Sequence, residues 1–388
     1  MGNINTRNLS AGLFQKAVES SQNGNISSTE KNALNQLAQK DGVNADERRL
    51  LNGLENKNNL QTLKASAHEP QTIQFENKPS GLDTLKAAGA DAKAQGKFQK
   101  LSGSQQQQFL GVLSKSSKKA DLLKLLGHGT MTQKDSKGKT TLHNLNRLQN
   151  GPHKSGVRGT QLADDAIARL RNRNCIKQGP HGTCGAGSVQ YAMMGKDPAE
   201  VVRMVADLAE KGKTTTRGGH TLNAGTGSLN WHKGDKTTDG SSENRDDFDI
   251  IFQSAAMRSM ALVGGDMDII LGGAADYNVN KDNGDGKSVA TGDSASDPLF
   301  VHSMMENISG KDYDSDSLWG TYGEMKTHAN QGKEPIALYS TGGGGMHYVT
   351  VKSVKNGNVN FYCTAWGKMR SMPEDEFKGK LMRTITPD

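Results

Sequence analysis

A cysteine near the middle of the chain follows a glutamine and several glycines in a pattern that could make a reactive thiol. Residues 178–188 read QGPHGTCGAGS, and residues 189–194 continue as a helix, so Cys184 is predicted at a helix N-terminus. Unpaired backbone N–H groups and the helix dipole stabilise a thiolate there, and the thiolate is the nucleophilic form. Gln178 could add its side-chain N–H to the backbone N–H of Cys184 and form an oxyanion hole.

A histidine 163 residues after this cysteine could supply the base. His347 follows four glycines and opens a stretch of aromatic and β-branched residues, which predicts a strand. Residues 355–358 read KNGN, an Asn-Gly signal for a hairpin turn, and residues 359–363 are the predicted returning strand. A histidine held on one strand and oriented from the next could act as general base for Cys184.

The order of these residues resembles that of the papain-like cysteine peptidases. Gln178, then Cys184 at a helix start, then His347 on a late strand and a Trp-Gly turn after the next strand follow the family's order. The segments QGPHGTCGAGS, HYVTVKSVKNGNVNFY and MPEDEF are most similar to the bacterial branch, which includes bacteriocin-processing peptidases. The resemblance covers about residues 174–377. It implies an α+β fold, in which a helical part bearing the cysteine packs against a twisted antiparallel sheet bearing the histidine.

Carried over by position, the resemblance makes Cys184 the nucleophile, His347 the general base and acid, and Gln178 the oxyanion-hole donor. The family has Asn or Asp ahead of the Trp-Gly pair to orient the histidine, whereas this chain has Thr364 there. Thr364 is therefore the predicted orienting residue. Asn360, on the same face of the strand, is the substitute candidate.

Three further residues are candidates for substrate contact: Gly182 and His181 ahead of the cysteine, and Trp366 after the returning strand. Glycine there would let the chain approach a substrate closely. For His181 a plain loop residue is the alternative interpretation. Three cysteines exclude a disulfide scaffold, and Cys175 and Cys363 are predicted to be buried thiols without a chemical role.

Residues 1–60 are predicted to form a degenerate EF-hand-like helical unit. Residues 19–30 read ESSQNGNISSTE and place Gly24 sixth and Glu30 twelfth, as in a calcium loop, but the other ligand positions lack the Asp residues of strong sites. We expect the helix–loop–helix shape without a metal, with calcium binding at this loop as the alternative. No other cofactor and no metal site are predicted.

The rest of the chain is predicted to contain a linker, an accessory region and the hydrolase domain. Residues 61–80 are polar and contain two prolines, which is typical of a linker. Residues 81–173 show helical periodicity without a catalytic pattern. Residues 174–388 would form the papain-like domain, with a long insertion near 213–332.

The net charge of +7 is unevenly distributed. Residues 1–173 hold 26 Lys and Arg against 14 Asp and Glu, whereas residues 174–388 hold 22 against 27, which suggests separate modules. Aromatic residues are not interleaved with the basic ones, so specific nucleic-acid binding is not predicted. No apolar run is long enough to span a membrane, and residues 1–10 do not resemble a signal peptide.

Together these features predict a thiol-dependent hydrolase of peptide, isopeptide or side-chain amide bonds. The substrate would be a protein, for example of a host or competitor cell. We expect a bacterial toxin or effector, either cytoplasmic in the producer or exported by a signal-independent secretion system. One alternative is a transglutaminase-like acyltransferase. Another is an impaired pseudo-peptidase that binds protein, because Thr364 carries no charge. The sequence carries no signal for the oligomeric state.

Overall fold

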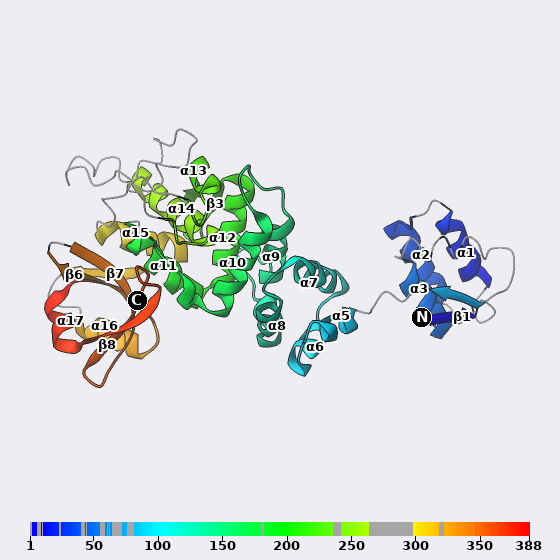
Figure 1. The fold of residues 1–388 in the computed structure, drawn as a ribbon, viewed down its shortest axis with the longest axis horizontal. Coiled ribbons are helices and arrows are strands. Elements are labelled where there is room, and N and C mark those ends of the chain that lie inside the picture. The colour runs from blue at the N-terminus through cyan, green and yellow to red at the C-terminus, as the bar shows by residue number, and fades with distance from the viewer. Residues whose placement is uncertain are drawn as a thin grey trace. The chain divides into compact units, whose positions relative to one another are not determined.

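The chain folds into two compact units of mixed helix and sheet. The computed structural model describes residues 2–5, 9, 11–22, 25–39, 43, 45–54, 59, 61, 63, 72–75, 81–179, 182–235, 242–263, 298–317, 322–343 and 345–388. The first unit is Met1–Thr84 and the second is Leu85–Asp388. Figure 1 shows the elements along the chain; the fold is α+β, as the sequence predicts.

The first unit packs three helices around leucines. The helices are α1 (Ala11–Ser21), α2 (Ser28–Gln39) and α3 (Ala45–Gly53), and an antiparallel pair of short strands, β1 (Gly2–Asn5) and β2 (Thr72–Phe75), accompanies them. Leu13, Leu34 and Leu50 are fully buried in this core. The region predicted to be helical thus contains three helices, while β2 falls inside the predicted linker.

The last residue of the predicted calcium loop has a structural partner. The Glu30 carboxylate accepts hydrogen bonds from the Ser27 N–H (2.8 Å) and hydroxyl (2.6 Å), and the Glu30 N–H donates to the Ser27 hydroxyl (3.2 Å). This is a capping box at the start of α2, and it lowers the pKa of Glu30. Asn23 and Gly24 lie outside the described residues, so a loop without metal stays a prediction and calcium binding stays its alternative.

The second unit begins with a series of helices joined by short connections. They are α5 (Gly81–Ala87), α6 (Ala92–Gln99), α7 (Gly103–Lys115), α8 (Lys119–His128), α9 (Thr141–Asn150), α10 (Gly159–Arg171), α11 (Cys184–Lys196), α12 (Pro198–Lys211), α13 (Thr226–Asn230), α14 (Asp247–Val263) and α15 (Pro298–Ser309). Two 3₁₀ turns, η2 (Thr130–Thr132) and η3 (Arg173–Cys175), and a small hairpin of β3 (Lys213–Thr215) and β4 (Thr221–Asn223) complete this part.

A six-stranded antiparallel sheet forms the rest of the second unit. Its strands are β5 (Tyr313–Ser317), β6 (Ile336–Gly342), β7 (Gly345–Lys355), β8 (Asn358–Cys363), β9 (Lys368–Pro373) and β10 (Leu381–Pro387), in the order β5-β10-β6-β7-β8-β9. On one face, Leu338, Tyr348 and Tyr362 join the core that contains α11. The other face packs against α16 (Tyr322–Asn330) and α17 (Glu374–Lys380) (Figure 1).

Two local signals in the sequence produce the geometry they predict. Asp197 caps α12 by accepting the Glu200 N–H (3.3 Å), and Pro198 occupies the first turn. Asn356 (φ 52°) and Gly357 (φ 70°) form the turn between β7 and β8, where both residues need a positive φ. The hairpin predicted from residues 355–358 is therefore confirmed.

Part of the charge difference between the two parts of the chain forms ion pairs between them. Four arginines from residues 81–173 pair with acids from residues 174–388. The pairs are Arg147 with Asp207 and Glu210 (both 2.6 Å), Arg158 with Asp247 (2.9 Å), Arg169 with Asp249 (2.7 Å) and Arg173 with Glu334 (2.6 Å). One hydrophobic core runs from Leu85 to Ile385. The structure thus differs from the predicted separate modules, since residues 81–173 and 174–388 share one unit.

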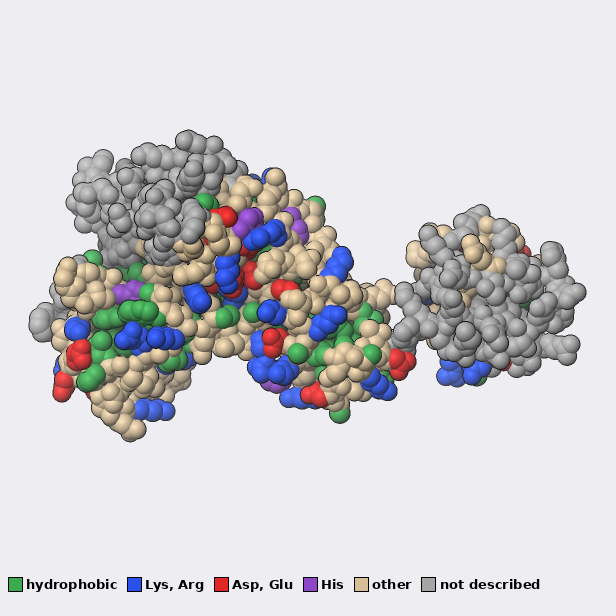
Figure 2. Space-filling view, in the orientation of Figure 1, with side chains coloured by type: hydrophobic (Ala, Val, Ile, Leu, Met, Phe, Trp, Pro, Cys, Tyr) green, Lys and Arg blue, Asp and Glu red, His purple; other side chains and the backbone are tan. Residues whose placement is uncertain are grey.

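Other basic side chains lie on the surface of this unit. Figure 2 shows Lys and Arg scattered among uncharged and acidic side chains over the helices on the face in view. None of the helices in the described part of the chain is long and apolar enough to cross a membrane.

Candidate active site

Cys184 is the first residue of α11, a helix buried along most of its length. Its side chain is 6% exposed. Two glycines let neighbouring elements approach the helix: a Cβ at Gly185 would lie 2.5 Å from Val301 of α15, and one at Gly187 would lie 3.2 Å from Thr364. These glycines thus serve packing of the helix, and the sulfur sits at the positive end of its dipole.

The loop before α11 is fixed by a buried polar network from α14. The Gln253 amide nitrogen donates to the Lys177 carbonyl (2.8 Å) and to Gln190 Oε1 (2.9 Å), and Gln253 Oε1 accepts the Thr183 hydroxyl (2.9 Å). Gln190 in turn donates to Asp249 (2.7 Å), which also receives two hydrogen bonds from Arg169. This network ties both ends of the loop that carries Gln178 to the interior.

Gln178 is held by Thr364. The Gln178 N–H donates to the Thr364 carbonyl (3.0 Å), and the Thr364 hydroxyl donates to Gln178 Oε1 (3.1 Å). Both residues are buried. The carbonyl end of the Gln178 side chain is held in this way, and the amide nitrogen is its donor end.

The histidine faces another cysteine. His347 Nε2 lies 3.0 Å from Cys363 Sγ; His347 is 8% exposed and Cys363 is fully buried. The rings of Tyr339 and Trp366 flank the imidazole, each with a centroid distance of 6.1 Å. Burial lowers the pKa of His347 to about 4, so the ring is neutral near pH 7.

These contacts correct the prediction for the residue that orients the histidine. Thr364 contacts Gln178, on the face of the sheet that meets α11, whereas Cys363 contacts His347. Asn360 donates to the Ser353 hydroxyl (3.3 Å) farther along the hairpin. Side chains alternate between faces along a strand, so neighbours such as Cys363 and Thr364 point in opposite directions.

The structure brings the cysteine helix and the histidine strand together. The Thr350 hydroxyl of β7 donates to the Ser188 carbonyl of α11 (3.3 Å). Burial raises the pKa of Cys363, and the charge of Cys184 adds to the rise; the same two causes act on Tyr339. The charge of Cys184 thus acts on two of the side chains that contact His347.

Two of the three residues predicted to contact the substrate, Gly182 and Trp366, are described by the structure. Gly182 directly precedes the buried Thr183, while His181 lies outside the described residues. Trp366 is 50% exposed, and the Arg370 guanidinium lies 4.3 Å from its ring centroid. Met346 and Met369 are the other exposed large hydrophobic side chains of the described residues, and both belong to the strands around His347.

The sequence analysis did not predict the contact between Cys363 and His347 or the hydrogen bonds of Gln253. Strand alternation counted from the hairpin turn would have paired Cys363 with Thr350, on the face opposite His347. The irregularity between Val351 and Ser353 shifts the register by one residue and brings Cys363 onto the histidine's face. No local signal existed for Gln253, because its partners lie 63 to 76 residues away in the chain.

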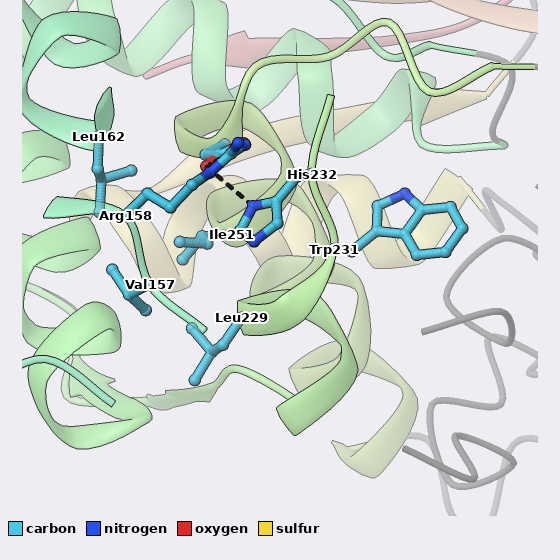
Figure 3. Close-up of a pocket in the computed structure, with 8 residues that line it drawn as sticks. Val157, Arg158, Leu162, Leu229, Trp231, His232 and Ile251 are labelled. Carbon is cyan, nitrogen blue, oxygen red and sulfur yellow. Dashed lines mark hydrogen bonds and ion pairs between the residues drawn. The ribbon is translucent and has the colours of Figure 1, made fainter. Parts of the chain in front are cut away.

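A separate pocket lies between α10, α13 and α14 (Figure 3). Asp247 accepts hydrogen bonds there from Arg158 (2.9 Å) and forms a contact with His232 Nδ1 (3.0 Å). Figure 3 shows Trp231 directed away from this group, and its indole N–H donates to Glu243 (3.0 Å). The charged groups in the pocket satisfy one another, so the pocket is best explained as part of the packing between helices.

Comparison with known proteins adds no family. The chain matches no protein-family model, and a search of curated proteins finds no match. Within the described ranges, no group of three or more His, Cys, Asp or Glu residues is arranged to hold a metal ion.

Proposed function

We propose that the protein is a thiol-dependent hydrolase with a papain-like arrangement, acting on peptide, isopeptide or side-chain amide bonds of a protein. One observation supports the proposal: α11, which begins with Cys184, packs on one face of β7, the strand whose other face carries the buried His347. Gln178 is fixed beside them by Thr364. The candidate nucleophile, base and oxyanion donor come from distant parts of the sequence and thus lie on elements that pack against one another.

The proposed reaction has two halves: Cys184 is first acylated by the substrate, and water then hydrolyses the acyl-enzyme. His347 takes the thiol proton of Cys184 as the sulfur bonds to the acyl carbon, and the carbonyl electron pair moves onto the oxygen. The Gln178 amide and the backbone N–H of Cys184 donate to that oxyanion. When the carbon–nitrogen bond breaks, His347 returns the proton to the leaving amine. Water, deprotonated by His347, then releases the acid and restores the thiol.

Burial lowers the pKa of His347 to about 4, which keeps the ring neutral near pH 7 but makes it a weaker base than an exposed histidine. A neutral imidazole can accept a proton, and burial keeps the ring neutral above about pH 4. Placing the sulfur at a helix N-terminus favours the negative charge that forms on it.

Acylation of Cys184 tests the proposal. We expect the full chain to release p-nitrophenol from p-nitrophenyl acetate, to form an acetyl group on Cys184 detectable by mass spectrometry, and to be labelled there by an epoxysuccinate. Cys184→Ala should abolish all three results. Cys175→Ala is the control and should leave them unchanged. Cys175 is a free thiol outside the site, and it is only partly buried, not buried as predicted from the sequence.

Two outcomes would contradict the proposal. Unchanged acylation in folded Cys184→Ala would exclude the nucleophile, and an inert Cys184 in the wild type would favour the protein-binding pseudo-peptidase. Transfer of the acetyl group to an added small primary amine, in preference to water, would favour the acyltransferase.

A further inference from the structure

Cys363 is the polar group that meets the imidazole of His347. Its sulfur lies 3.0 Å from Nε2, within the range for a hydrogen bond involving sulfur, and both side chains are buried. The other contacts of the ring among the described residues are the edges or faces of Tyr339 and Trp366, which pack against it. Cys363 is thus placed to decide how the imidazole is turned and which nitrogen carries its proton.

The fold of β8 creates this pairing. Phe361 and Cys363 belong to the core between the sheet and α16 and α17, whereas Tyr362 contributes to the core that contains α11. Thr364 continues on the α11 face, where it holds Gln178. The position that could have oriented the histidine is therefore committed to the oxyanion donor, and the residue before it contacts the histidine.

We propose that Cys363 is the positioning residue of His347. Its sulfur accepts the Nε2–H, which fixes the imidazole in the tautomer whose Nδ1 carries the lone pair, the nitrogen that receives the Cys184 proton. This inference rests on the proposed function. A thiol is a weak acceptor, so it holds the ring without adding a full negative charge beside it.

Cys363 is poorly suited to be the nucleophile itself. It is fully buried among apolar side chains that include Val349, Phe361 and Phe377, so a protein substrate could not reach its sulfur. Burial also raises the pKa of the thiol, which disfavours the thiolate needed for attack. Cys184, by contrast, is the first residue of a helix, where the helix dipole stabilises the thiolate.

The first test needs no variant. Nitrogen-15 NMR of the histidine-labelled full chain, with His347→Gln to assign the signal, distinguishes the two neutral tautomers of an imidazole. We expect His347 to be the Nε2–H form at pH 7 and to titrate at about pH 4. Finding the Nδ1–H form would overturn the proposal, because the thiol of Cys363 would then be donating to the ring.

The second test compares variants at Cys363 by the rate of Cys184 acetylation. Cys363→Ala should slow acetylation about five- to tenfold, the factor expected for losing one neutral hydrogen bond, and should leave a mixture of tautomers. Cys363→Ser keeps an acceptor at the same position and should stay within about twofold of the wild type. Thermal unfolding of each variant establishes that it is folded.

Failures of the two proposals can be told apart. An alanine variant that acetylates at the wild-type rate, with the same pH dependence and a single tautomer, overturns the role of Cys363 while the hydrolase stands. An unreactive Cys184 overturns the hydrolase, yet the tautomer measurement still tests the Cys363–His347 contact. Acetylation found on Cys363 in place of Cys184 would overturn the assignment of both cysteines.

Discussion

Thr364 and Cys363 are sequence neighbours whose side chains serve different partners. The Thr364 hydroxyl donates to Gln178 Oε1 at 3.1 Å, and the Cys363 sulfur lies 3.0 Å from His347 Nε2. One residue thus fixes the proposed oxyanion donor and the next contacts the proposed base. This division predicts that the two can be perturbed separately.

Thr364→Val tests this division, because valine has nearly the same shape without the hydroxyl. It should leave Gln178 Oε1 without that donor, cost about 1–2 kcal/mol of unfolding free energy, and slow acetylation of Cys184 by p-nitrophenyl acetate about tenfold. Alkylation of Cys184 by iodoacetamide passes through no oxyanion, so its rate and pH dependence should not change.

Thr350→Val is the matched control for this substitution. Thr350 is also buried, and its hydroxyl donates to Ser188 of α11 at 3.3 Å, so the same substitution should reduce stability with little effect on acetylation. A shift of the His347 titration in Thr364→Val would instead support the role predicted from the sequence, in which Thr364 orients the histidine.

At the scale of elements, α14 positions the start of α11. Gln253 of α14 makes three buried hydrogen bonds, to Thr183, Gln190 and the Lys177 carbonyl. A helix N-terminus can stabilise a thiolate only if the preceding loop keeps the helix start in place. The reactivity of Cys184 should therefore depend on a side chain 69 residues away in the sequence.

Gln253→Leu tests this dependence. The variant removes all three hydrogen bonds and leaves their partners buried, so we expect a loss of about 2–4 kcal/mol in unfolding free energy and slower acetylation of Cys184 even where the protein remains folded. Urea unfolding and the acetylation rate measure the two effects.

Gln149→Leu supplies the comparison for Gln253→Leu. Gln149 is a buried glutamine of α9 whose amide donates to the Val112 carbonyl (3.2 Å), away from the loop before α11. Its substitution should cost about 1 kcal/mol and leave acetylation unchanged. Equal effects of the two substitutions on acetylation would show that the α14 network has no special bearing on Cys184.

At the scale of the whole molecule, the opposite charges of the two parts of the chain are joined inside one unit. Asp249 is fully buried, and its ion pair is with Arg169, which lies before the predicted domain boundary at residue 173. Removing one member of a buried pair costs about 3–5 kcal/mol, because the remaining charge is left without compensation. The helices of residues 85–173 are thus part of the second folded unit.

Fragments of the chain should reflect this arrangement. A fragment of residues 85–388 is expected to unfold cooperatively in urea, while residues 174–388 lack Arg147, Arg158, Arg169 and Arg173 and should show no cooperative transition. Circular dichroism in urea measures the cooperativity of unfolding of each fragment, and the dispersion of NMR signals shows whether the fragment is folded. A fragment of 174–388 that unfolds at the same urea concentration as 85–388 would support the domain boundary predicted from the sequence.

Features that depend on a few consecutive residues were determined by the sequence alone. The Asp197–Pro198 helix start, the Asn356–Gly357 turn and the helical periodicity of the first unit all follow from local hydrogen bonding, φ preferences and the spacing of apolar side chains. The placement of Cys184 at the start of a helix belongs to the same class.

The partners of the site residues were decided only by the tertiary structure. A shift of one position along β8 exchanges the two faces of the sheet, so the sequence could not show whether Thr364 or Cys363 meets His347. Likewise, the sequence shows that the two parts of the chain differ in net charge, but not that arginines of the first part form ion pairs with acidic residues of the second. Such pairings join residues up to 186 positions apart, as for Thr364 and Gln178, and depend on how the helices and the sheet pack.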